Sequence, residues 1–384
     1  MNIVADGNLP LAAEVFGPLG SLSLIDTADF RPETIRGADA LVIRSETKVG
    51  PGLLDGSRVR FVGTASIGID HLDLDYLAAR SIAFANAPGC NSHSVKEYSA
   101  AALLESARRL GFALAGKTIG VIGVGAVGGK AARAAEALGL KVLLNDPPLA
   151  RTTGASRYVP LDALMDSDIL TLHVPLTKIG PDPTFHLFDE ARFSRLRGAP
   201  LLINTSRGAV VETAALLRAL GEGRLRAAVL DVWEGEPAID DGLLERVLIG
   251  TAHVAGYSLE GKVRAVAMVR DALVRHFGLG SVSLPAIEPG PAGLPPIEIP
   301  ETAEADEDVI RTAVAAAYDI SLDDGLLRAS QAGPSAEHRA AFARLRSGYR
   351  VRREFAARTV ILPERCAAAG AALAALGFKV DFRR

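Results

Sequence analysis

Short apolar runs alternate with helical patterns along the first hundred residues. Runs of this kind, without an interleaved polar face, are typical of parallel strands that are buried on both sides. We predict such strands at Asn2–Ala5, Leu22–Ile25, Ala40–Ile43, Phe61–Thr64 and Ile82–Ala85. The segment Asn91–Leu110 then predicts a long helix, opened by an Asn or Ser cap, that carries the chain into a second domain.

A second series of apolar runs follows this helix. We predict strands at Ile169–His173, Pro200–Asn204, Ala227–Asp231 and Leu248–Thr251, with helices such as Thr213–Leu220 between them. The amphipathic stretch Leu259–Phe277 predicts a helix that returns the chain to the first domain. We therefore expect a split substrate-binding domain at residues 1–98 and 257–284, a nucleotide-binding domain at residues 99–256, and substrate in the cleft between them.

The most informative segment lies at residues 118–146. An apolar run leads into Gly123-x-Gly125-x-x-Gly128, a helical stretch follows, and a second apolar run ends at Asp146. This order predicts a Rossmann-type βαβ unit in which Gly123 permits the tight turn, Gly125 lets pyrophosphate approach, and Gly128 lets the helix pack on the strand. The helix N-terminus offers N–H groups to the phosphates. A carboxylate at Asp146 accepts hydrogen bonds from ribose hydroxyls and repels a 2′-phosphate, which favours NAD over NADP.

Proline and glycine change the pattern after this second domain. Residues 284–300 contain six prolines and two glycines, a composition that disfavours regular structure, so we predict a linker at residues 285–300. Beyond it, Asp306–Tyr318 has helical spacing, and Arg358–Leu362 with Ala367–Val380 predicts a strand, a helix and a strand. We expect a separate α+β domain at residues 301–384.

Composition and charge argue against several classes of function. With 49% hydrophobic residues, 23% charged residues and a net charge of −3, nothing indicates a nucleic-acid or membrane partner. No apolar stretch reaches the ~18 residues of a membrane span and no signal peptide is apparent, so we expect a cytoplasmic protein. Cys90 and Cys366 lack metal-ligand spacing and are too few for a disulfide framework, so we expect reduced thiols and no metal. For Cys90 a packing role is favoured over a reactive one.

Three successive predicted strands are followed by complementary polar residues, Arg207, Glu236 and His253. Open α/β sheets bind ligands beyond the carboxyl ends of their strands. Arginine binds a carboxylate and polarises a carbonyl, histidine exchanges a proton near neutral pH, and glutamate orients the imidazole and stabilises its charged form. Together they suit oxidation of a 2-hydroxy acid. Each residue alone also fits a structural role: a surface ion pair, a turn, or a hydrogen-bonded core histidine.

Several of these segments carry a family resemblance. Four of them resemble the NAD-dependent D-2-hydroxyacid dehydrogenases: Gly-Val-Gly-Ala-Val-Gly at the glycine turn, Asn204-Thr-Ser-Arg-Gly-Ala-Val-Val, Asp231-Val-Trp-Glu-Gly-Glu-Pro and His253-Val-Ala-Gly-Tyr. Others resemble the erythronate-4-phosphate dehydrogenases of that family: Arg44-Ser-Glu-Thr-Lys-Val, Ala87-Pro-Gly-Cys-Asn, Asp146-Pro-Pro and Leu345-Arg-x-x-Tyr-x-x-Arg-Arg-Glu. The resemblance covers essentially the entire chain.

The resemblance implies an α/β fold with a Rossmann-type NAD-binding domain, a flavodoxin-like substrate domain and a C-terminal α+β domain that forms a homodimer. It implies oxidation of 4-phospho-D-erythronate to 2-oxo-3-hydroxy-4-phosphobutanoate in pyridoxal 5′-phosphate (vitamin B6) synthesis. It also implies that Arg207 and Glu236 are active-site residues and that His253 is the proton acceptor. Substrate contacts are implied at Ser45, Ser66 and Tyr257. An NAD site is implied at Gly123, Gly125, Ala126, Val127, Gly128, Asp146, Val174, Thr205, Ser206, Arg207, Asp231 and Gly256.

Two positions depart from the family pattern. Val174 stands where the family has threonine, so only a backbone contact to NAD remains there, and Ser66 replaces threonine but keeps the hydroxyl. Two other functions stay open: another D-2-hydroxyacid dehydrogenase, such as a D-3-phosphoglycerate dehydrogenase, and a non-catalytic NAD-sensing module of the same fold.

The arginine-rich stretch Arg339–Arg358 adds a hypothesis about the substrate. Arg346, Arg350 or a neighbour would reach the substrate phosphate, across the dimer interface. The alternative is a solvated helix face with acidic partners.

Overall fold

The computed structural model describes residues 1–280, 289–290, 293–302 and 305–383. The chain divides into two compact units, Met1–Asn91 with Ser258–Pro291 and Ser92–Tyr257 with Ala292–Arg384. The predicted domain boundary at residue 98 falls inside a helix that begins at Ser92, and the boundary between the units lies just before that helix.

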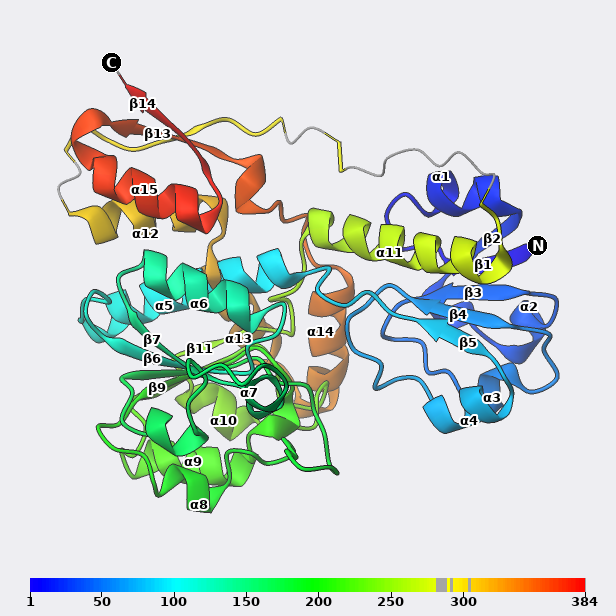
Figure 1. Cartoon of the computed structure of the whole chain (residues 1–384), viewed down its shortest axis with the longest axis horizontal. Coiled ribbons are helices and arrows are strands. Elements are labelled where there is room, and N and C mark those ends of the chain that lie inside the picture. Colours follow the sequence, from blue (N-terminus) through cyan, green and yellow to red (C-terminus); the bar gives the residue numbers. More distant parts are fainter. Residues whose placement is uncertain (281–288, 291–292, 303–304, 384) are drawn as a thin grey trace. The chain divides into compact units, whose positions relative to one another are not determined.

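The first unit is built on a five-stranded parallel sheet in the order β2-β1-β3-β4-β5 (Figure 1). Its strands are β1 (Asn2–Asp6), β2 (Ser21–Ile25), β3 (Ala40–Ile43), β4 (Phe61–Thr64) and β5 (Ala83–Ala85). Its helices are α1 (Ala12–Phe16), α2 (Pro32–Ile35), α3 (Pro51–Leu54), α4 (Leu74–Ala79) and α11 (Leu259–Phe277), with 3-10 turns η1 (Gly17–Leu19) and η2 (Thr27–Asp29). This is the flavodoxin-like strand order.

Helices cover both faces of this sheet. Ile3 and Val42 pack under α1 and α11, whereas Val4 and Leu41 pack against α2, α3 and α4. Successive residues of a strand point to opposite faces, so a strand covered on both sides has no polar alternation. The continuous apolar runs in the sequence have this cause. Helix α11 begins after Ser258, whose hydroxyl accepts a hydrogen bond from the Gly261 N–H at 2.9 Å.

The second unit contains a six-stranded parallel sheet in the order β11-β10-β9-β8-β6-β7. Its strands are β6 (Thr118–Ile122), β7 (Lys141–Asn145), β8 (Ile169–Leu172), β9 (Leu201–Asn204), β10 (Ala227–Leu230) and β11 (Ile249–Gly250). Its helices are α5 (Ser92–Leu110), α6 (Gly128–Ala137), α7 (Pro147–Thr153), α8 (Glu190–Phe193), α9 (Thr213–Gly221) and α10 (Asp241–Arg246), with 3-10 turns η3 (Leu161–Leu164) and η4 (Gly208–Val210).

An isolated parallel bridge between Leu144 and Tyr158 extends this sheet beyond β7. If the bridge counts as the third strand, after β6 and β7, the sheet has the Rossmann strand order. In that order the chain turns to the opposite side of β6 when it continues into β8. The glycine turn follows β6, at the point where such sheets bind nucleotides. Figure 1 shows α5 and α6 on one face of the sheet and α8, α9 and α10 on the other.

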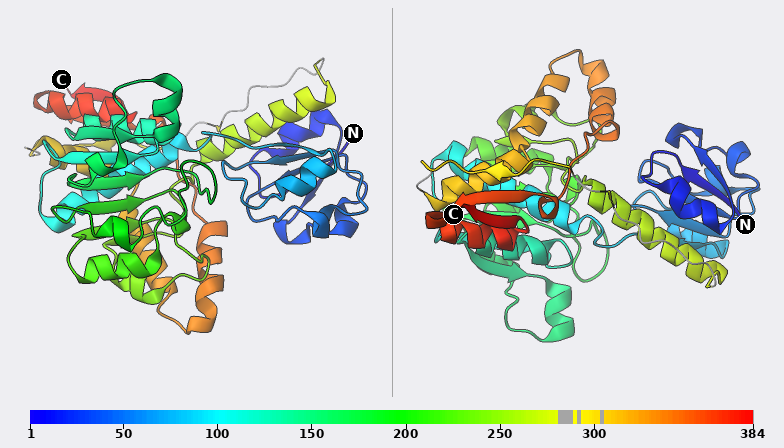
Figure 2. Two further views of the ribbon diagram at one scale, coloured as in Figure 1. Left: turned by 60° about the horizontal axis from the view of Figure 1, so that its bottom comes forward. Right: turned by 90° about the horizontal axis from the view of Figure 1, so that it is seen from above.

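The C-terminal segment adds a three-stranded parallel sheet in the order β12-β13-β14 and several helices. Its elements are β12 (Ile297–Glu298), α12 (Asp306–Ala317), α13 (Ile320–Ser330), α14 (Ser335–Ser347), η5 (Phe355–Ala357), β13 (Thr359–Pro363), η6 (Glu364–Cys366), α15 (Ala367–Leu376) and β14 (Lys379–Arg383). Helices α12 and α15 pack on α5 and α6. The views of Figure 2 show the α13–α14 hairpin, in orange, extending away from α12 and α15.

The sequence predicts an α+β domain at residues 301–384; in the structure this segment belongs to the same compact unit as the glycine turn. One hydrophobic cluster includes Tyr98 and Leu103 of α5 together with Val309 of α12 and Leu373 of α15. Helix α5 is buried on nearly all sides, with every residue of Ala100–Leu104 inaccessible or almost so. A helix buried on nearly all sides requires cover on every face, and the C-terminal segment supplies the outer cover of α5.

The linker prediction is wrong over part of its length. Residues 285–288 and 291–292 lie outside the described residues, but Ile297–Glu298 forms strand β12 and pairs with Val360 and Ile361 of β13. Ile297 and Ile299 are buried in the shared cluster. Proline on each side does not prevent pairing, because an edge strand needs hydrogen bonds on one side only.

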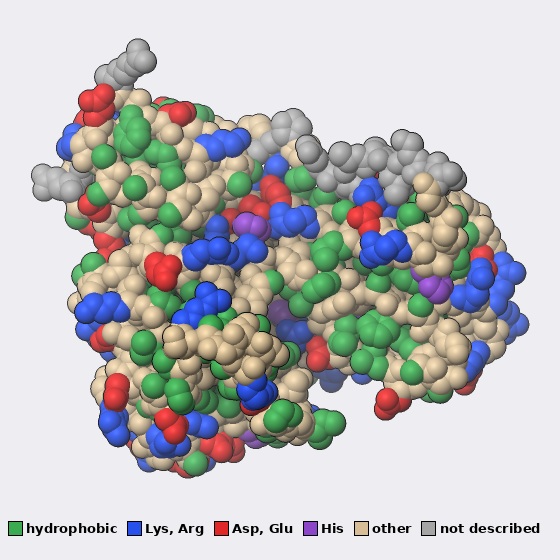
Figure 3. Space-filling view, in the orientation of Figure 1, with side chains coloured by type: hydrophobic (Ala, Val, Ile, Leu, Met, Phe, Trp, Pro, Cys, Tyr) green, Lys and Arg blue, Asp and Glu red, His purple; other side chains and the backbone are tan. Residues whose placement is uncertain are grey.

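Charged side chains are mixed over the molecular surface. On the face drawn in Figure 3, basic and acidic groups are interspersed over each unit, in agreement with a net charge of −3. Among the described helices, including the 19-residue α5 and α11, none combines the length and apolar character needed to cross a bilayer.

Candidate active site

The glycine turn after β6 has the geometry that its sequence predicts. Gly123 has φ of 85°, and a Cβ atom there would lie 2.8 Å from the carbonyl oxygen of His173. A Cβ on Gly128 would lie 1.8 Å from the carbonyl oxygen of Gly123, so only glycine lets α6 approach the strand this closely. A Cβ on Gly125 would meet nothing within 4 Å, which leaves open space beside the backbone. The turn therefore fits a pyrophosphate between Gly125 and the N-terminus of α6.

Asp146 follows β7, caps the N-terminus of α7 and holds the glycine turn. One carboxylate oxygen accepts the N–H of Leu149 at 2.9 Å, at the start of α7, and the other accepts the N–H of Val124 at 2.8 Å. Each carboxylate oxygen has a second lone pair that remains able to accept a ribose hydroxyl. Val174 lies against the turn, because its Cγ1 atom would be 2.9 Å from a Cβ on Gly123.

His173 lies at the end of β8 and is held in a neutral form. Its Nε2 is 3.0 Å from the Thr171 hydroxyl and its Nδ1 is 3.1 Å from the Thr205 hydroxyl. Burial lowers the pKa of His173 to about 4. Thr205, predicted to contact NAD, thus also positions this imidazole.

We expect the stability of the protein to fall as the pH falls from about 6.5 to about 4, in part because of His173. Its pKa is lower in the folded state, so the unfolded chain binds the proton first, and the stabilisation present above the ordinary pKa is lost as the pH falls through this window. Thermal unfolding of His173→Gln should depend less steeply on pH than that of the unmodified protein. Parallel curves for the two proteins between pH 4 and 7 would contradict this assignment.

Arg207 lies between Asn204 and Gly208, which fix the backbone after β9. Asn204 accepts the hydroxyl and the N–H of Ser206, at 2.7 and 3.0 Å, and its amide donates to the Arg207 carbonyl at 3.1 Å. A Cβ on Gly208 would lie 1.9 Å from the Trp233 carbonyl carbon, so a larger residue would separate this turn from the next strand end. The Asn-Thr-Ser-Arg-Gly motif therefore fixes the backbone that carries the Arg207 guanidinium.

Glu236 and His253 form a direct pair. Glu236 Oε1 is hydrogen-bonded to His253 Nδ1, and Glu236 Oε2 accepts the Trp233 N–H at 3.1 Å. Burial favours the neutral form of Glu236, but the charges of His253 and Arg346 and the hydrogen bonds outweigh it and lower the pKa of this carboxyl. The nearby Glu234 belongs to a different pair, with His186 Nε2 at 2.6 Å. The structure thus distinguishes the two acids of the Trp-Glu-Gly-Glu motif.

His253 has a backbone conformation that its neighbours enforce. Its φ of 56° lies in the left-handed region, which residues other than glycine seldom adopt. Buried Asp231 accepts the N–H groups of Val254 and Ala255 at 2.8 and 3.0 Å, while its own carbonyl accepts the His253 N–H at 2.7 Å. Burial raises the pKa of Asp231, and these donors act against that effect. Asp231, predicted as an NAD contact, is therefore also the residue that holds the His253 loop.

Sequence reasoning missed several residues that support this loop. The Trp233 indole N–H donates to the Thr251 carbonyl at 2.9 Å, and the Tyr98 hydroxyl lies 2.8 Å from the Thr251 hydroxyl. From the C-terminal segment, Asp324 accepts the Gly250 N–H at 2.9 Å, and buried Arg352 donates to the Ala255 carbonyl. The sequence offered one signal for these residues: Trp233, the single tryptophan of the chain, lies in the Asp231-Val-Trp-Glu-Gly-Glu-Pro motif. The C-terminal contacts join residues far apart in the chain and have no local signature.

The predicted substrate residues occur in both units. Ser45 and Ser66 are half-buried just beyond the carboxyl ends of β3 and β4 in the first unit, and the Ser66 hydroxyl donates to the Gly68 carbonyl at 2.8 Å. Gly256 and Tyr257 belong to the second unit, four residues or fewer after His253. The Tyr257 ring packs edge-on against Tyr349, with centroids 5.7 Å apart.

Cys90 and Cys366 are both buried and neither forms a disulfide, and Cys90 packs beside Ala87 and Ala265. Within the described part of the chain, no three His, Cys, Asp or Glu side chains are grouped as metal ligands.

Comparison with known proteins agrees with this geometry. The family model of the D-isomer specific 2-hydroxyacid dehydrogenase NAD-binding domain matches residues 90–255, and a domain of unknown function (DUF3410) matches residues 294–377. The erythronate-4-phosphate dehydrogenase of Salinibacter ruber is 45% identical over 368 residues, which cover 94% of each chain. The chain belongs to the erythronate-4-phosphate dehydrogenase family. The relative from Pectobacterium carotovorum is 43% identical over 389 residues, 100% of this chain and 99% of that protein.

Solved structures support the same fold for part of the chain. An NAD complex of a formate dehydrogenase from Staphylococcus aureus has 25% identity and a TM-score of 0.61, over 74% of this chain and 97% of the other. A D-lactate dehydrogenase from Aquifex aeolicus, complexed with NAD and lactic acid, has 27% identity and a TM-score of 0.57, over 73% and 96% of the two chains. The predicted family, α/β fold class and NAD cofactor are confirmed. The individual roles of the site residues stay predictions.

Proposed function

We propose that this member of the erythronate-4-phosphate dehydrogenase family oxidises 4-phospho-D-erythronate to 2-oxo-3-hydroxy-4-phosphobutanoate, a step in pyridoxal 5′-phosphate synthesis. The observation that carries the proposal is the Glu236–His253 pair, in the same unit as a nucleotide turn, in a chain 45% identical to a named erythronate-4-phosphate dehydrogenase. Its name specifies a substrate with a carboxylate, a hydroxyl group at C2 and a phosphate.

The residues divide the chemistry between them. Arg207 binds the substrate carboxylate and polarises the C2 oxygen. His253 accepts the hydroxyl proton at Nε2, because its Nδ1 is bonded to Glu236, and the Glu236 carboxylate stabilises the imidazolium that forms. When bound, NAD accepts the hydride from C2. Ser45, Ser66 and Tyr257 offer hydroxyl groups to the polar substrate.

A direct assay tests the proposal. The purified protein should form NADH from NAD and 4-phospho-D-erythronate, with a higher kcat/KM than for D-3-phosphoglycerate, followed by absorbance at the NADH band. A preference for D-3-phosphoglycerate would assign the chain to that reaction. Tight NAD binding without turnover of any 2-hydroxy acid would instead support a non-catalytic NAD-sensing module.

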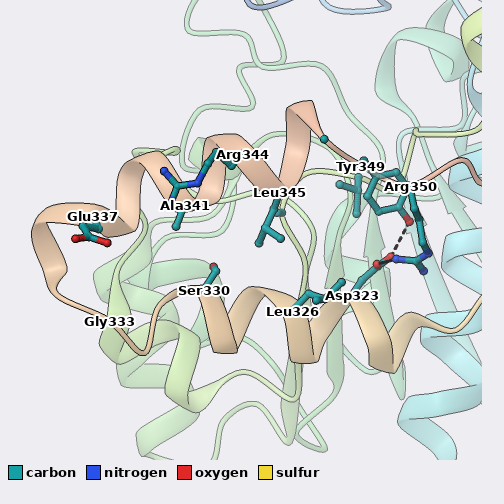
Figure 4. Close-up of a pocket in the computed structure, with 13 residues that line it drawn as sticks. Asp323, Leu326, Ser330, Gly333, Glu337, Ala341, Arg344, Leu345, Tyr349 and Arg350 are labelled. Atoms are coloured by element: carbon teal, nitrogen blue, oxygen red, sulfur yellow. Dashed lines mark hydrogen bonds and ion pairs between the residues drawn. The ribbon is translucent and has the colours of Figure 1, made fainter.

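A homodimer formed through the C-terminal segment is part of the proposal. Leu326 of α13 and Leu345 of α14 line a cavity of about 400 Å³ (Figure 4). Leu322 and Leu326 are 47% and 43% exposed. Apolar side chains at this spacing on one helix offer a surface for a partner. Light scattering after size exclusion should give twice the mass of one chain, and a single-chain mass at micromolar concentration would contradict the dimer.

A cytoplasmic location is also proposed, because neither Cys90 nor Cys366 forms a disulfide and thiols persist in a reducing compartment.

A further inference from the structure

The arginines of residues 339–358 have different surroundings. Arg350 is paired with buried Asp323, which also accepts the Tyr349 hydroxyl at 2.7 Å (Figure 4). Arg352 is buried, lies 3.9 Å from the Tyr318 ring centroid and donates to the Ser94 carbonyl at 2.7 Å. These two guanidinium groups connect α13, α5 and the segment after α14. They serve the packing of the C-terminal segment rather than the binding of a ligand.

Arg346 lies on the inward face of α14. Phe342, Leu345 and Arg346 follow the spacing i, i+3 and i+4, which places them on one side of α14, and Tyr349 follows just after the helix ends at Ser347. Phe342 is 1% exposed, and Leu345 and Tyr349 pack against the cluster that contains Trp233 and Val254. The face that carries Arg346 therefore packs on the strand ends that carry Glu236 and His253. Arg344, two residues earlier, is exposed.

The charge of Arg346 acts on the catalytic pair. Burial alone would raise the pKa of Glu236, but the charge of His253 comes next in effect and, with that of Arg346, lowers it. The packing is consistent with this effect, because the Tyr349 ring, three residues after Arg346, lies edge-on against Tyr257, four residues after His253, with centroids 5.7 Å apart. Arg346 and Glu236 belong to the same unit of the same chain, so no partner subunit is needed to bring them together.

A cation at this place has opposite effects on the two members of the Glu236–His253 pair. It favours the Glu236 carboxylate, but it opposes the positive charge that His253 acquires when it accepts the hydroxyl proton. A dianionic group bound to Arg346 would remove that opposition. The phosphate of a 4-phospho 2-hydroxy acid is such a group, and guanidinium binds phosphate through paired hydrogen bonds.

We propose that Arg346, supplied by α14 of the same chain, binds the phosphate of the substrate and so determines the preference for phosphorylated over unphosphorylated 2-hydroxy acids. This inference rests on the proposed function, because the phosphate belongs to the substrate named there. It makes the C-terminal segment part of the substrate site in addition to its role in covering α5.

Substitution of Arg346 tests the inference. Arg346→Gln should raise KM for 4-phospho-D-erythronate by about 10- to 100-fold, the usual loss for a hydrogen bond to a charged group. Binding of D-erythronate, measured as substrate or as competitive inhibitor, should change much less, and inhibition by inorganic phosphate should weaken. Arg346→Lys should restore part of the preference, since it returns the charge without the paired hydrogen bonds. Arg344→Gln is the matched control and should stay within about twofold of the unmodified enzyme.

The outcomes separate the inference from the function on which it rests. An unmodified protein that does not oxidise 4-phospho-D-erythronate would refute the proposed function. An active protein whose Arg346→Gln variant keeps its full preference for the phosphorylated acid would refute the inference alone. Equal losses for phosphorylated and unphosphorylated ligands would also overturn it, because they would assign Arg346 to positioning the Glu236–His253 pair. A thermal unfolding curve for each variant identifies any that fail to fold.

Discussion

His253→Ala should lower kcat by ~10²–10⁴-fold and leave the Kd for NAD nearly unchanged. The imidazole is the group proposed to accept the hydroxyl proton, and because Glu236 is bonded to its Nδ1, Nε2 is the atom left for that proton. The glycine turn that fits NAD lies after β6, whereas His253 follows β11 at the other side of the sheet, so the two measurements respond to different parts of the site. Stopped-flow turnover and a fluorescence titration with NADH measure them separately.

His186 provides the matched control for this variant. It forms a second histidine–glutamate pair in the same unit, with Glu234, and the His186 side chain is 30% exposed. His186→Ala should retain turnover within about threefold, as most substitutions away from the chemistry do. If His253→Ala keeps more than a tenth of the kcat, or if both histidine variants lose turnover equally, His253 is not the proton acceptor.

Alanine at Gly125 should weaken NAD binding by about 10- to 100-fold without unfolding the protein, since hydrogen bonds from backbone N–H to phosphate would be lost. The added Cβ meets no protein atom within 4 Å, so it should leave folding unchanged and should obstruct only the bound NAD. Gly128→Ala differs, because its Cβ would lie 1.8 Å from the Gly123 carbonyl oxygen. We expect a loss of ~1–3 kcal/mol in the free energy of unfolding together with the loss of NAD binding.

Gly129→Ala is the control for both glycine variants. Its Cβ would lie 3.6 Å from the Val124 carbonyl oxygen, an ordinary contact, and alanine favours the helix by ~0.5–1 kcal/mol over glycine. Its NAD affinity should match the unmodified protein. Calorimetric titration and thermal unfolding of the three variants check the set. Equal NAD affinity in Gly125→Ala and Gly129→Ala would mean that the pyrophosphate does not lie against Gly125.

The helices and strands of the two parallel sheets could be predicted from sequence because their signals are local. Continuous apolar runs marked β3, β4 and β8 to within a residue, and the only large difference was β11, which is two residues long instead of four. A short edge strand has a weak signal. The third Rossmann strand is reduced to the bridge at Tyr158 and left no apolar run to detect. The resemblance and the motif spacing together also gave Arg207, Glu236 and His253 as candidate catalytic residues, and their roles stay predictions.

The environment of each arginine could not be predicted in this way. Arg346 and Arg350 are four residues apart in the same basic stretch, and sequence offers both as phosphate ligands. In the structure Arg350 pairs with Asp323, while the charge of Arg346 acts on Glu236. The sequence separations are 27 and 110 residues, so neither pairing leaves a periodic pattern. Only the packing of α14 against the strand ends distinguishes them.

By itself the sequence determined the βαβ nucleotide turn, the two α/β sheets and the residue types needed for hydride transfer, because glycine conformation, strand burial and helix spacing depend on neighbouring residues. The tertiary structure decided that the C-terminal segment covers α5 and shares its core, that Glu236 rather than Glu234 pairs with His253, and that Asp231 holds the left-handed backbone of His253. These features join residues distant in the chain. Their energies arise only when burial removes water from between the groups.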